Sequence, residues 1–144
     1  MVSDRDDLMV RFLDAIDREI AIQLARSQSP STLDTLFIGG GTPTHLSVPL
    51  LDRFLSRIRD RFSFAAGYEW SVEANPEDID AEKLSLLKDH GINRVSLGVQ
   101  SFDVQKLRVL ERGHSAEAAT RAVERVADLI DNVSIDLIFA APGE

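Results

Sequence analysis

Apolar residues recur along the chain at two spacings, which predict alternating helices and strands. In residues 6–27 they return every three or four positions, as in a helix with one buried face. The same spacing predicts four later helices, each preceded by a residue that can cap a helix N-terminus: Ser47, Asp80, Asp103 and Ser115. Short apolar runs between the helices are predicted strands, and they cover residues 35–38, 69–73, 94–100 and 133–139.

Strands that are separated by helices pair in parallel, because parallel neighbours need a long crossover connection. The pattern therefore predicts an α/β fold of about four βα units, either part of a parallel β/α (TIM-like) barrel or an open parallel sheet. The sequence opens directly into a helix and stops at Glu144, just after a strand and its turn. We therefore expect residues 1–144 to be one partial domain, truncated at both ends.

Composition narrows the class of protein. Of the 144 residues, 44% are hydrophobic and 28% are charged, as in globular proteins. No apolar run approaches the roughly 20 residues that span a bilayer, and the polar first residues do not resemble a signal peptide, so we expect a cytoplasmic protein. The net charge of −8 disfavours non-specific binding to nucleic acid or anionic lipid.

The chain contains no cysteine, which excludes disulfides, thiolate zinc sites and a Cys-ligated iron–sulfur cluster within it. The three histidines, His45, His90 and His114, lie far apart in the sequence. None of them has the helical spacing of paired metal ligands, so we predict no metal site from the residues present.

Candidate chemistry collects at the predicted strand ends, where parallel β/α architectures bind ligands. The groups there are Gly39, Gly40, Gly41 and Thr42 after the first strand, Glu73 and Asn75 at the second, Gln100 and Ser101 at the third, and Asp136 within the fourth. The glycine run lacks the Lys-Ser/Thr of a P-loop and, at Thr44, the third glycine of a dinucleotide fingerprint. Its glycines still allow a ligand to approach the backbone closely.

The polar side chains leave alternatives open. Glu73 can accept hydrogen bonds from ribose hydroxyls or an ammonium group, or it can pair with an arginine at the rim. Gln100 can bond a sugar or a base, or cap the next helix. Asp136 lies among apolar residues, and we expect a buried carboxylate that needs a cation, a donor or a ligand. Arg112 is a candidate partner for it, although an exposed arginine at a helix end is the simpler interpretation.

Four motifs resemble those of radical S-adenosylmethionine (SAM) proteins, in the group of oxygen-independent coproporphyrinogen III oxidases and heme chaperones. They are Phe37-Ile-Gly-Gly-Gly-Thr-Pro-Thr44, Val72-Glu-Ala-Asn-Pro76, Asn93-Arg-Val-Ser-Leu-Gly-Val-Gln-Ser-Phe102 and Ser134-Ile-Asp-Leu-Ile138. Each motif alone is weak, but four in the same order at matching intervals are specific. The resemblance extends over nearly the whole chain, from the first helix to Gly143.

This resemblance implies a partial β/α barrel that binds SAM beside a [4Fe–4S] cluster, which reduces the sulfonium and yields a 5′-deoxyadenosyl radical. Carried over by position, Gly40, Gly41 and Thr42 would approach the methionine portion of SAM. The remaining polar contacts would match Glu73, Gln100, Arg112 and Asp136. In the oxidases the radical takes a hydrogen from a propionate side chain of the tetrapyrrole, and oxidative decarboxylation follows. The related chaperones hold and deliver heme.

The motifs Glu-Ala-Asn-Pro and Arg-Gly-His-Ser resemble the heme chaperones more closely than the oxidases. The family's cluster cysteines, in a Cys-x3-Cys-x2-Cys arrangement, precede the first helix, where this chain begins. We therefore expect a fragment of a longer parent that binds the cluster elsewhere, uses an electron donor that the sequence does not identify, and is inactive as this chain alone.

Two alternatives remain at this point. One is a non-catalytic β/α module that binds an adenosyl or other small ligand without redox chemistry. The other is a fragment of a TIM-barrel hydrolase with Glu73 and Asp136 as acid and base, which lacks a clear nucleophile. Cysteines encoded upstream of Met1 would favour the radical SAM interpretation, and a genuine start at Met1 would favour the non-catalytic module.

Overall fold

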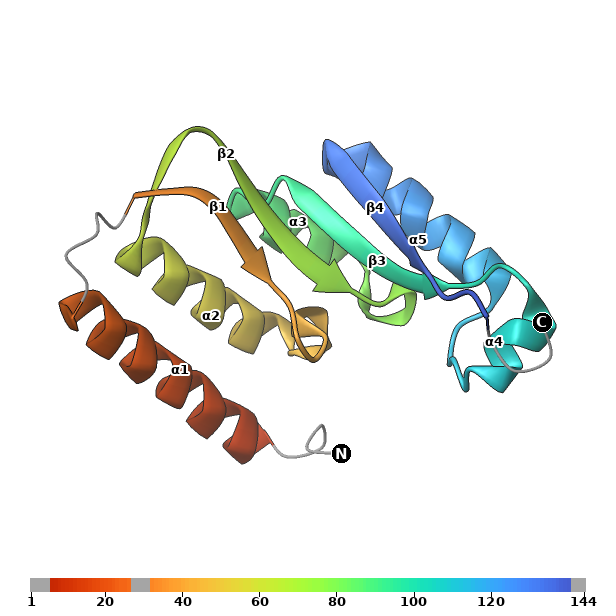
Figure 1. Ribbon diagram of the computed structural model, residues 1–144, viewed down its shortest axis with the longest axis horizontal. Coiled ribbons are helices and arrows are strands. Elements are labelled where there is room, and N and C mark those ends of the chain that lie inside the picture. Colours follow the sequence, from red (N-terminus) through yellow and green to blue (C-terminus); the bar gives the residue numbers. More distant parts are fainter. Residues whose placement is uncertain (1–5, 27–31, 141–144) are drawn as a thin grey trace.

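The computed structural model describes residues 6–26 and 32–140, which form alternating helices and strands (Figure 1). The elements are α1 (Asp6–Arg26), β1 (Thr32–Ile38), α2 (Val48–Arg61), β2 (Ser63–Ala74), α3 (Ala81–Asp89), β3 (Arg94–Gln100), α4 (Val104–Val109), α5 (Ala116–Leu129) and β4 (Asn132–Leu137). Two short 3₁₀ helices, η1 (Pro43–His45) and η2 (Pro76–Asp78), follow β1 and β2. Among the described helices, none has the length and apolar character needed to cross a membrane.

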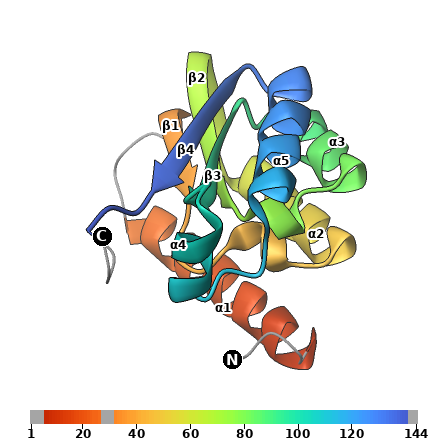
Figure 2. The ribbon, with the colours of Figure 1, turned by 90° about the vertical axis from the view of Figure 1, so that its right-hand side faces the viewer.

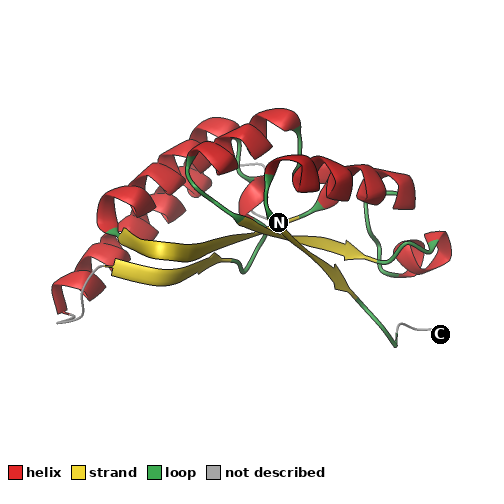
Figure 3. Ribbon diagram, turned by 90° about the horizontal axis from the view of Figure 1, so that it is seen from above, coloured by secondary structure: helices red, strands yellow, loops and turns green. Residues whose placement is uncertain are grey.

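The four strands form one parallel sheet in the order β1-β2-β3-β4. The predicted α/β fold with parallel pairing is therefore confirmed. Figure 3 shows the helices gathered on one face of this sheet, and no described helix covers the other face. Figure 2 shows β4 at the near edge, with α5 against one side of it. The sheet thus has a covered face and an open face.

Along β3, side chains alternate between these two faces. In β3, Val95, Leu97 and Val99 are fully buried under the helices, whereas the residues between them are only partly buried. Trp70 and Val72 of β2 are also fully buried on the covered side. Leucines and valines of the helices complete this core: Leu51, Leu55, Leu84, Leu87 and Val126. Burial of these apolar surfaces is the main force that holds the helices on the sheet.

The open face carries polar side chains beside the exposed ring of Phe37, the register partner of Ser71. Ser71 donates a hydrogen bond to Glu69 (Oγ to Oε1, 2.9 Å), and Arg94 of the next strand donates to the same carboxylate (Nη1 to Oε2, 3.1 Å). These two hydrogen bonds, the one from Ser71 first, hold the pKa of Glu69 below the ordinary value for glutamate. The open face therefore has the charges and hydroxyls of a ligand-facing surface, in contrast to the apolar covered face.

The predicted caps are largely confirmed. Asp80, Asp103 and Ser115 each accept a hydrogen bond from the backbone N–H three residues later, as helix N-caps do. Ser47 occupies the N-cap position of α2, but its side chain makes no capping hydrogen bond. Pro49 stands in the first turn of that helix, where its missing N–H costs nothing.

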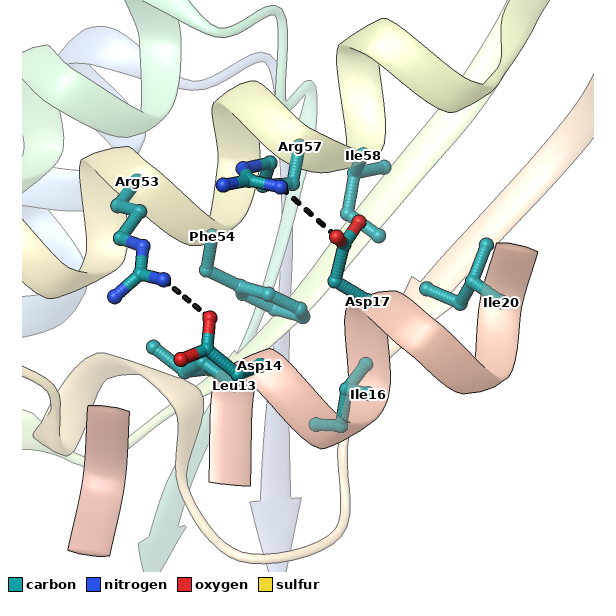
Figure 4. A pocket seen from close by; sticks show the side chains of 9 residues that line it. All are labelled: Leu13, Asp14, Ile16, Asp17, Ile20, Arg53, Phe54, Arg57 and Ile58. Atoms are coloured by element: carbon teal, nitrogen blue, oxygen red, sulfur yellow. Dashed lines mark hydrogen bonds and ion pairs between the residues drawn. The ribbon is translucent and has the colours of Figure 1, made fainter. Parts of the chain in front are cut away.

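Helix α1 packs on α2 through a mixed seam (Figure 4). Leu13, Ile16, Ile20, Phe54 and Ile58 supply its apolar part. Asp14 pairs with Arg53, and Asp17 pairs with Arg57 (2.8 Å) and Arg61 (2.9 Å). The small pocket in this seam contains none of the predicted site residues, so we assign it to packing.

Candidate ligand site at the carboxyl ends of the strands

The glycine loop after β1 lies against the carboxylate of Glu73 at the end of β2. The backbone N–H of Gly40 donates to Glu73 Oε2 at 3.1 Å. Gly40 and Gly41 have φ angles of 79° and 73°, in the left-handed region that glycine adopts without steric cost. A Cβ at either position would meet nothing within 4 Å, so this loop has open space beside it. The structure therefore brings together a carboxylate and an accessible backbone turn.

Asn75 connects three strand ends. Its Nδ2 donates to Thr42 Oγ1 at 2.9 Å, which ties the end of β2 to the glycine loop. Its Oδ1 accepts from Arg112 Nη2 at 3.0 Å, and the same Nη2 lies 3.3 Å from the carbonyl oxygen of Gly98 in β3. Arg112, the candidate partner of Asp136, directs its guanidinium to Asn75 and the β3 backbone instead, and it is half-buried rather than exposed.

Gln100 ends β3 in an unusual conformation, with φ of 65°. Its backbone carbonyl accepts from the N–H of Ile138, which follows β4, at 3.0 Å. Its side chain lies over Gly98: a Cβ at position 98 would be 2.9 Å from Gln100 Nε2 and 3.2 Å from Asn75 Oδ1. The amides of Gln100 and Asn75 therefore lie side by side at the strand ends.

Asp136 is exposed on β4, so the expectation of a buried carboxylate is wrong. Both of its carboxylate oxygens accept from the hydroxyl of Ser96, at 3.0 and 2.9 Å, and Ser134 donates to Ser96 at 3.1 Å. The reason for the difference is position: Asp136 lies on the face of the sheet that no described helix covers. Ser96 is the register partner of Glu73, so the two carboxylates share this face.

His114 is a residue that sequence reasoning did not select. Its side chain is 1% exposed, with Nδ1 3.0 Å from Glu77 Oε2 and Nε2 2.9 Å from the carbonyl oxygen of Val99. The sequence shows it only as an isolated histidine in the Arg-Gly-His-Ser motif. Its burial next to the end of β3 depends on the tertiary fold, and spacing along the chain cannot reveal it.

The assembled groups suit a small polar ligand. Two carboxylates, Glu73 and Asp136, can accept from ammonium or hydroxyl groups, and the Gln100 amide can both donate and accept. Among the described residues, no cluster of three or more His, Asp or Glu side chains is placed to hold a metal ion. The site residues therefore provide hydrogen-bonding and charge recognition through side chains and exposed backbone.

Comparisons with known proteins show the family of the chain. The family model of the radical SAM superfamily matches residues 9–144. The heme chaperone HemW of Bacillus subtilis (strain 168) is 38% identical over 135 residues, which cover 92% of this chain and 35% of that protein. The oxygen-independent coproporphyrinogen III oxidase of Paracoccus denitrificans (strain Pd 1222) is 35% identical over 113 residues, or 78% of this chain and 25% of that protein.

A solved structure is similar as well. The coproporphyrinogen III oxidase HemN of Escherichia coli, a radical SAM enzyme, superposes with a TM-score of 0.84 at 28% identity, and the match covers 98% of this chain and 32% of that one. The predicted partial β/α (TIM-like) barrel is thereby confirmed. The chain spans about a third or less of the length of each of these relatives.

Proposed function

This chain belongs to the radical SAM superfamily, and we propose that it is the SAM-binding part of a longer protein that handles heme or a related tetrapyrrole. In this proposal residues 1–144 are one partial radical SAM core domain. The observation that carries it is the contact between the Gly40 backbone and Glu73, on the same open face as Asp136 and beside Gln100. Carboxylates and an open glycine turn are suited to the ammonium and hydroxyl groups of SAM.

Each predicted residue has a place in this proposal. Gly40, Gly41 and Thr42 would lie along the methionine portion, with Glu73 accepting from its ammonium group. Gln100 and Asp136 would bond the nucleoside, and the guanidinium of Arg112 would favour the SAM carboxylate while it holds Asn75. When bound, SAM supplies a sulfonium group that one-electron reduction can cleave. The residues of this chain bind and orient that group.

The residues present do not fit a [4Fe–4S] cluster. Thiolates of cysteine are the usual ligands of such clusters, and this chain has none. We propose that any cluster of the complete protein is bound by cysteines outside residues 1–144.

Among the tetrapyrrole-related activities, we favour a heme chaperone. The motifs Glu73-Ala-Asn-Pro76 and Arg112-Gly-His-Ser115 resemble that branch, and several relatives named as heme chaperones are 38–39% identical to this chain. A coproporphyrinogen III oxidase-like parent is the alternative. A SAM-binding module without redox chemistry is the second candidate, and cysteines encoded upstream of Met1 would argue against it.

The test uses the protein encoded by the complete reading frame that contains this chain, with SAM and heme titrated separately by calorimetry. We expect SAM binding, and we expect Glu73→Ala to weaken it about ten- to a hundredfold through loss of charge-assisted hydrogen bonds. Glu124→Ala, an exposed glutamate on α5, is the matched control and should bind like wild type. A folded wild type that does not bind SAM would refute the proposal. Heme binding separates the chaperone from the other candidates.

A further inference from the structure

The end of β3 contains a tight turn centred on Gln100. The N–H of Ser101 donates to the carbonyl oxygen of Val99 at 2.8 Å, across a single intervening residue. Gln100, that intervening residue, has φ of 65°. A hydrogen bond between residues i and i+2 around a positive φ defines the rarer, strained form of the γ-turn. A strained turn of this kind persists only when surrounding contacts hold it.

The carbonyl of Val99 has a second donor, which is the ring of His114. Nε2 of His114 lies 2.9 Å from that oxygen, and the histidine side chain is 1% exposed. A carbonyl oxygen can only accept, so Nε2 carries the proton in this contact. His114 is thus a buried donor to the same oxygen that closes the γ-turn.

The other ring nitrogen is held by a carboxylate. Nδ1 of His114 lies 3.0 Å from Glu77 Oε2, and a carboxylate also only accepts. Both ring nitrogens therefore lie within hydrogen-bond distance of an acceptor oxygen, one from Glu77 and one from Val99. These two contacts hold the ring from both sides and fix its plane, as buried polar groups require partners. The ring links η2, which contains Glu77, to the last residues of β3.

We propose that His114 is a positioning residue for the ligand site: it holds the γ-turn at Val99–Ser101 and thereby directs the Gln100 side chain across Gly98 towards Asn75. This inference rests on the proposed function, since the ligand that Gln100 meets is SAM in that proposal. His114 itself touches the backbone of β3 and acts on the ligand only through Gln100.

Three substitutions of His114 separate its two contacts. His114→Leu removes both donors at similar volume. His114→Gln keeps an amide N–H that can reach the Val99 carbonyl, and His114→Asn keeps a shorter one suited to Glu77. The matched control is His90→Leu, because His90 also pairs with a carboxylate, that of Asp52 at 2.7 Å, but none of its contacts involves a predicted site residue.

The first measurement is amide hydrogen exchange of Ser101 in the protein without ligand. We expect the Ser101 amide to exchange about tenfold faster in His114→Leu and His114→Asn than in wild type. Without the contact from residue 114, the Val99 carbonyl is less firmly held and its hydrogen bond with the Ser101 N–H opens more often. His114→Gln and His90→Leu should exchange like wild type. Unchanged Ser101 exchange in folded His114→Leu would overturn the proposal. If His114→Leu does not fold, the Gln and Asn variants decide: equal exchange in both would overturn it.

The second measurement is SAM affinity by calorimetry in the protein from the complete reading frame. We expect His114→Leu to raise the Kd about tenfold, His114→Gln to restore most of the affinity, and the effect to vanish when Gln100 is already replaced by alanine. An equal loss in the Gln100→Ala background would show a general structural role and contradict positioning. If wild type does not bind SAM, the proposed function fails, whereas the exchange measurement still tests the role of His114.

Discussion

Gly98 provides the space in which two amide side chains of the site lie. A methyl group at this position would be 2.9 Å from Gln100 Nε2, which is the end of a flexible side chain, and 3.2 Å from Asn75 Oδ1. We expect Gly98→Ala to displace the Gln100 amide and to lower SAM affinity about tenfold, with little loss of stability. Calorimetry and a thermal melt on the same sample test this. Wild-type affinity in the folded variant would mean that the position of the Gln100 side chain does not matter.

The carboxylate of Glu69 makes the free energy of unfolding depend on pH in the acid range. Its folded pKa lies below the unfolded value because Ser71 and Arg94 donate to the carboxylate, so the unfolded state binds more protons in acid. The stabilisation that Glu69 contributes is therefore fully present at pH values above the ordinary glutamate pKa of about 4.3. It is lost as the pH falls through the lower pKa of Glu69 in the folded state. We expect Glu69→Gln to flatten the acid limb of the unfolding free energy slightly, since the pair is exposed to solvent. Denaturant melts between neutral and acid pH measure this slope, and identical slopes would contradict the assignment.

For single residues, the sequence predicted which side chains lie at the strand ends better than it predicted their hydrogen-bond partners. The strand-end rule located Glu73 and Gln100, and the structure places both at the ends of β2 and β3. The expected burial of Asp136 was wrong, because its apolar neighbours in the sequence do not reveal that it lies on the face that no described helix covers. Its candidate partner Arg112 donates to Asn75 instead. Asn75 connects the ends of three strands, and the spacing of residues along the chain does not show which strand ends become neighbours in the fold.

The loop after β1 is the element whose backbone depends most on glycine. At Gly41 the φ of 73° is costly for a β-branched residue, whereas asparagine enters this region more readily. We expect Gly41→Val to abolish SAM binding and also to lower stability by about 1–2 kcal/mol. Gly41→Asn should keep most of the stability. Melts and calorimetry of both variants separate the two effects, and equal stability of the two variants would argue against backbone strain.

Helices and strands with a regular spacing of apolar residues were predicted well. A strand segment without such spacing, at the start of β2, was not predicted. Helices α3, α4 and α5 begin at the expected caps, and β3 has its predicted bounds. Strand β2 begins six residues earlier than predicted, at Ser63 rather than Glu69. The segment between these residues contains Gly67 and lacks β-branched residues, but it belongs to the strand because Ser63 and Phe64 pair with β1 across a register shift. Tertiary pairing overrides local preference here.

For the molecule as a whole, the absence of cysteine gives a direct prediction. We expect the 144-residue chain, incubated anaerobically with iron and sulfide, to assemble no stoichiometric [4Fe–4S] cluster, because no thiolate ligand is present. Absorption spectra should lack thiolate-to-iron charge-transfer bands, and incubation with SAM and a reductant should give no 5′-deoxyadenosine. A relative that contains its cysteines is the positive control. A stoichiometric cluster with product formation would show that other residues can serve as ligands.

The seam between α1 and α2 makes one part of the molecule sensitive to ionic strength. Asp14 and Asp17 of α1 meet three arginines of α2, and these pairs are partly open to solvent. Dissolved ions screen exposed pairs, with a Debye length of about 8 Å at physiological salt and about 3 Å at 1 M. The apolar contacts under the sheet are not weakened in this way. Concentrated salt should therefore loosen the hold of α2 on α1 while the four strands and their buried leucines and valines stay together.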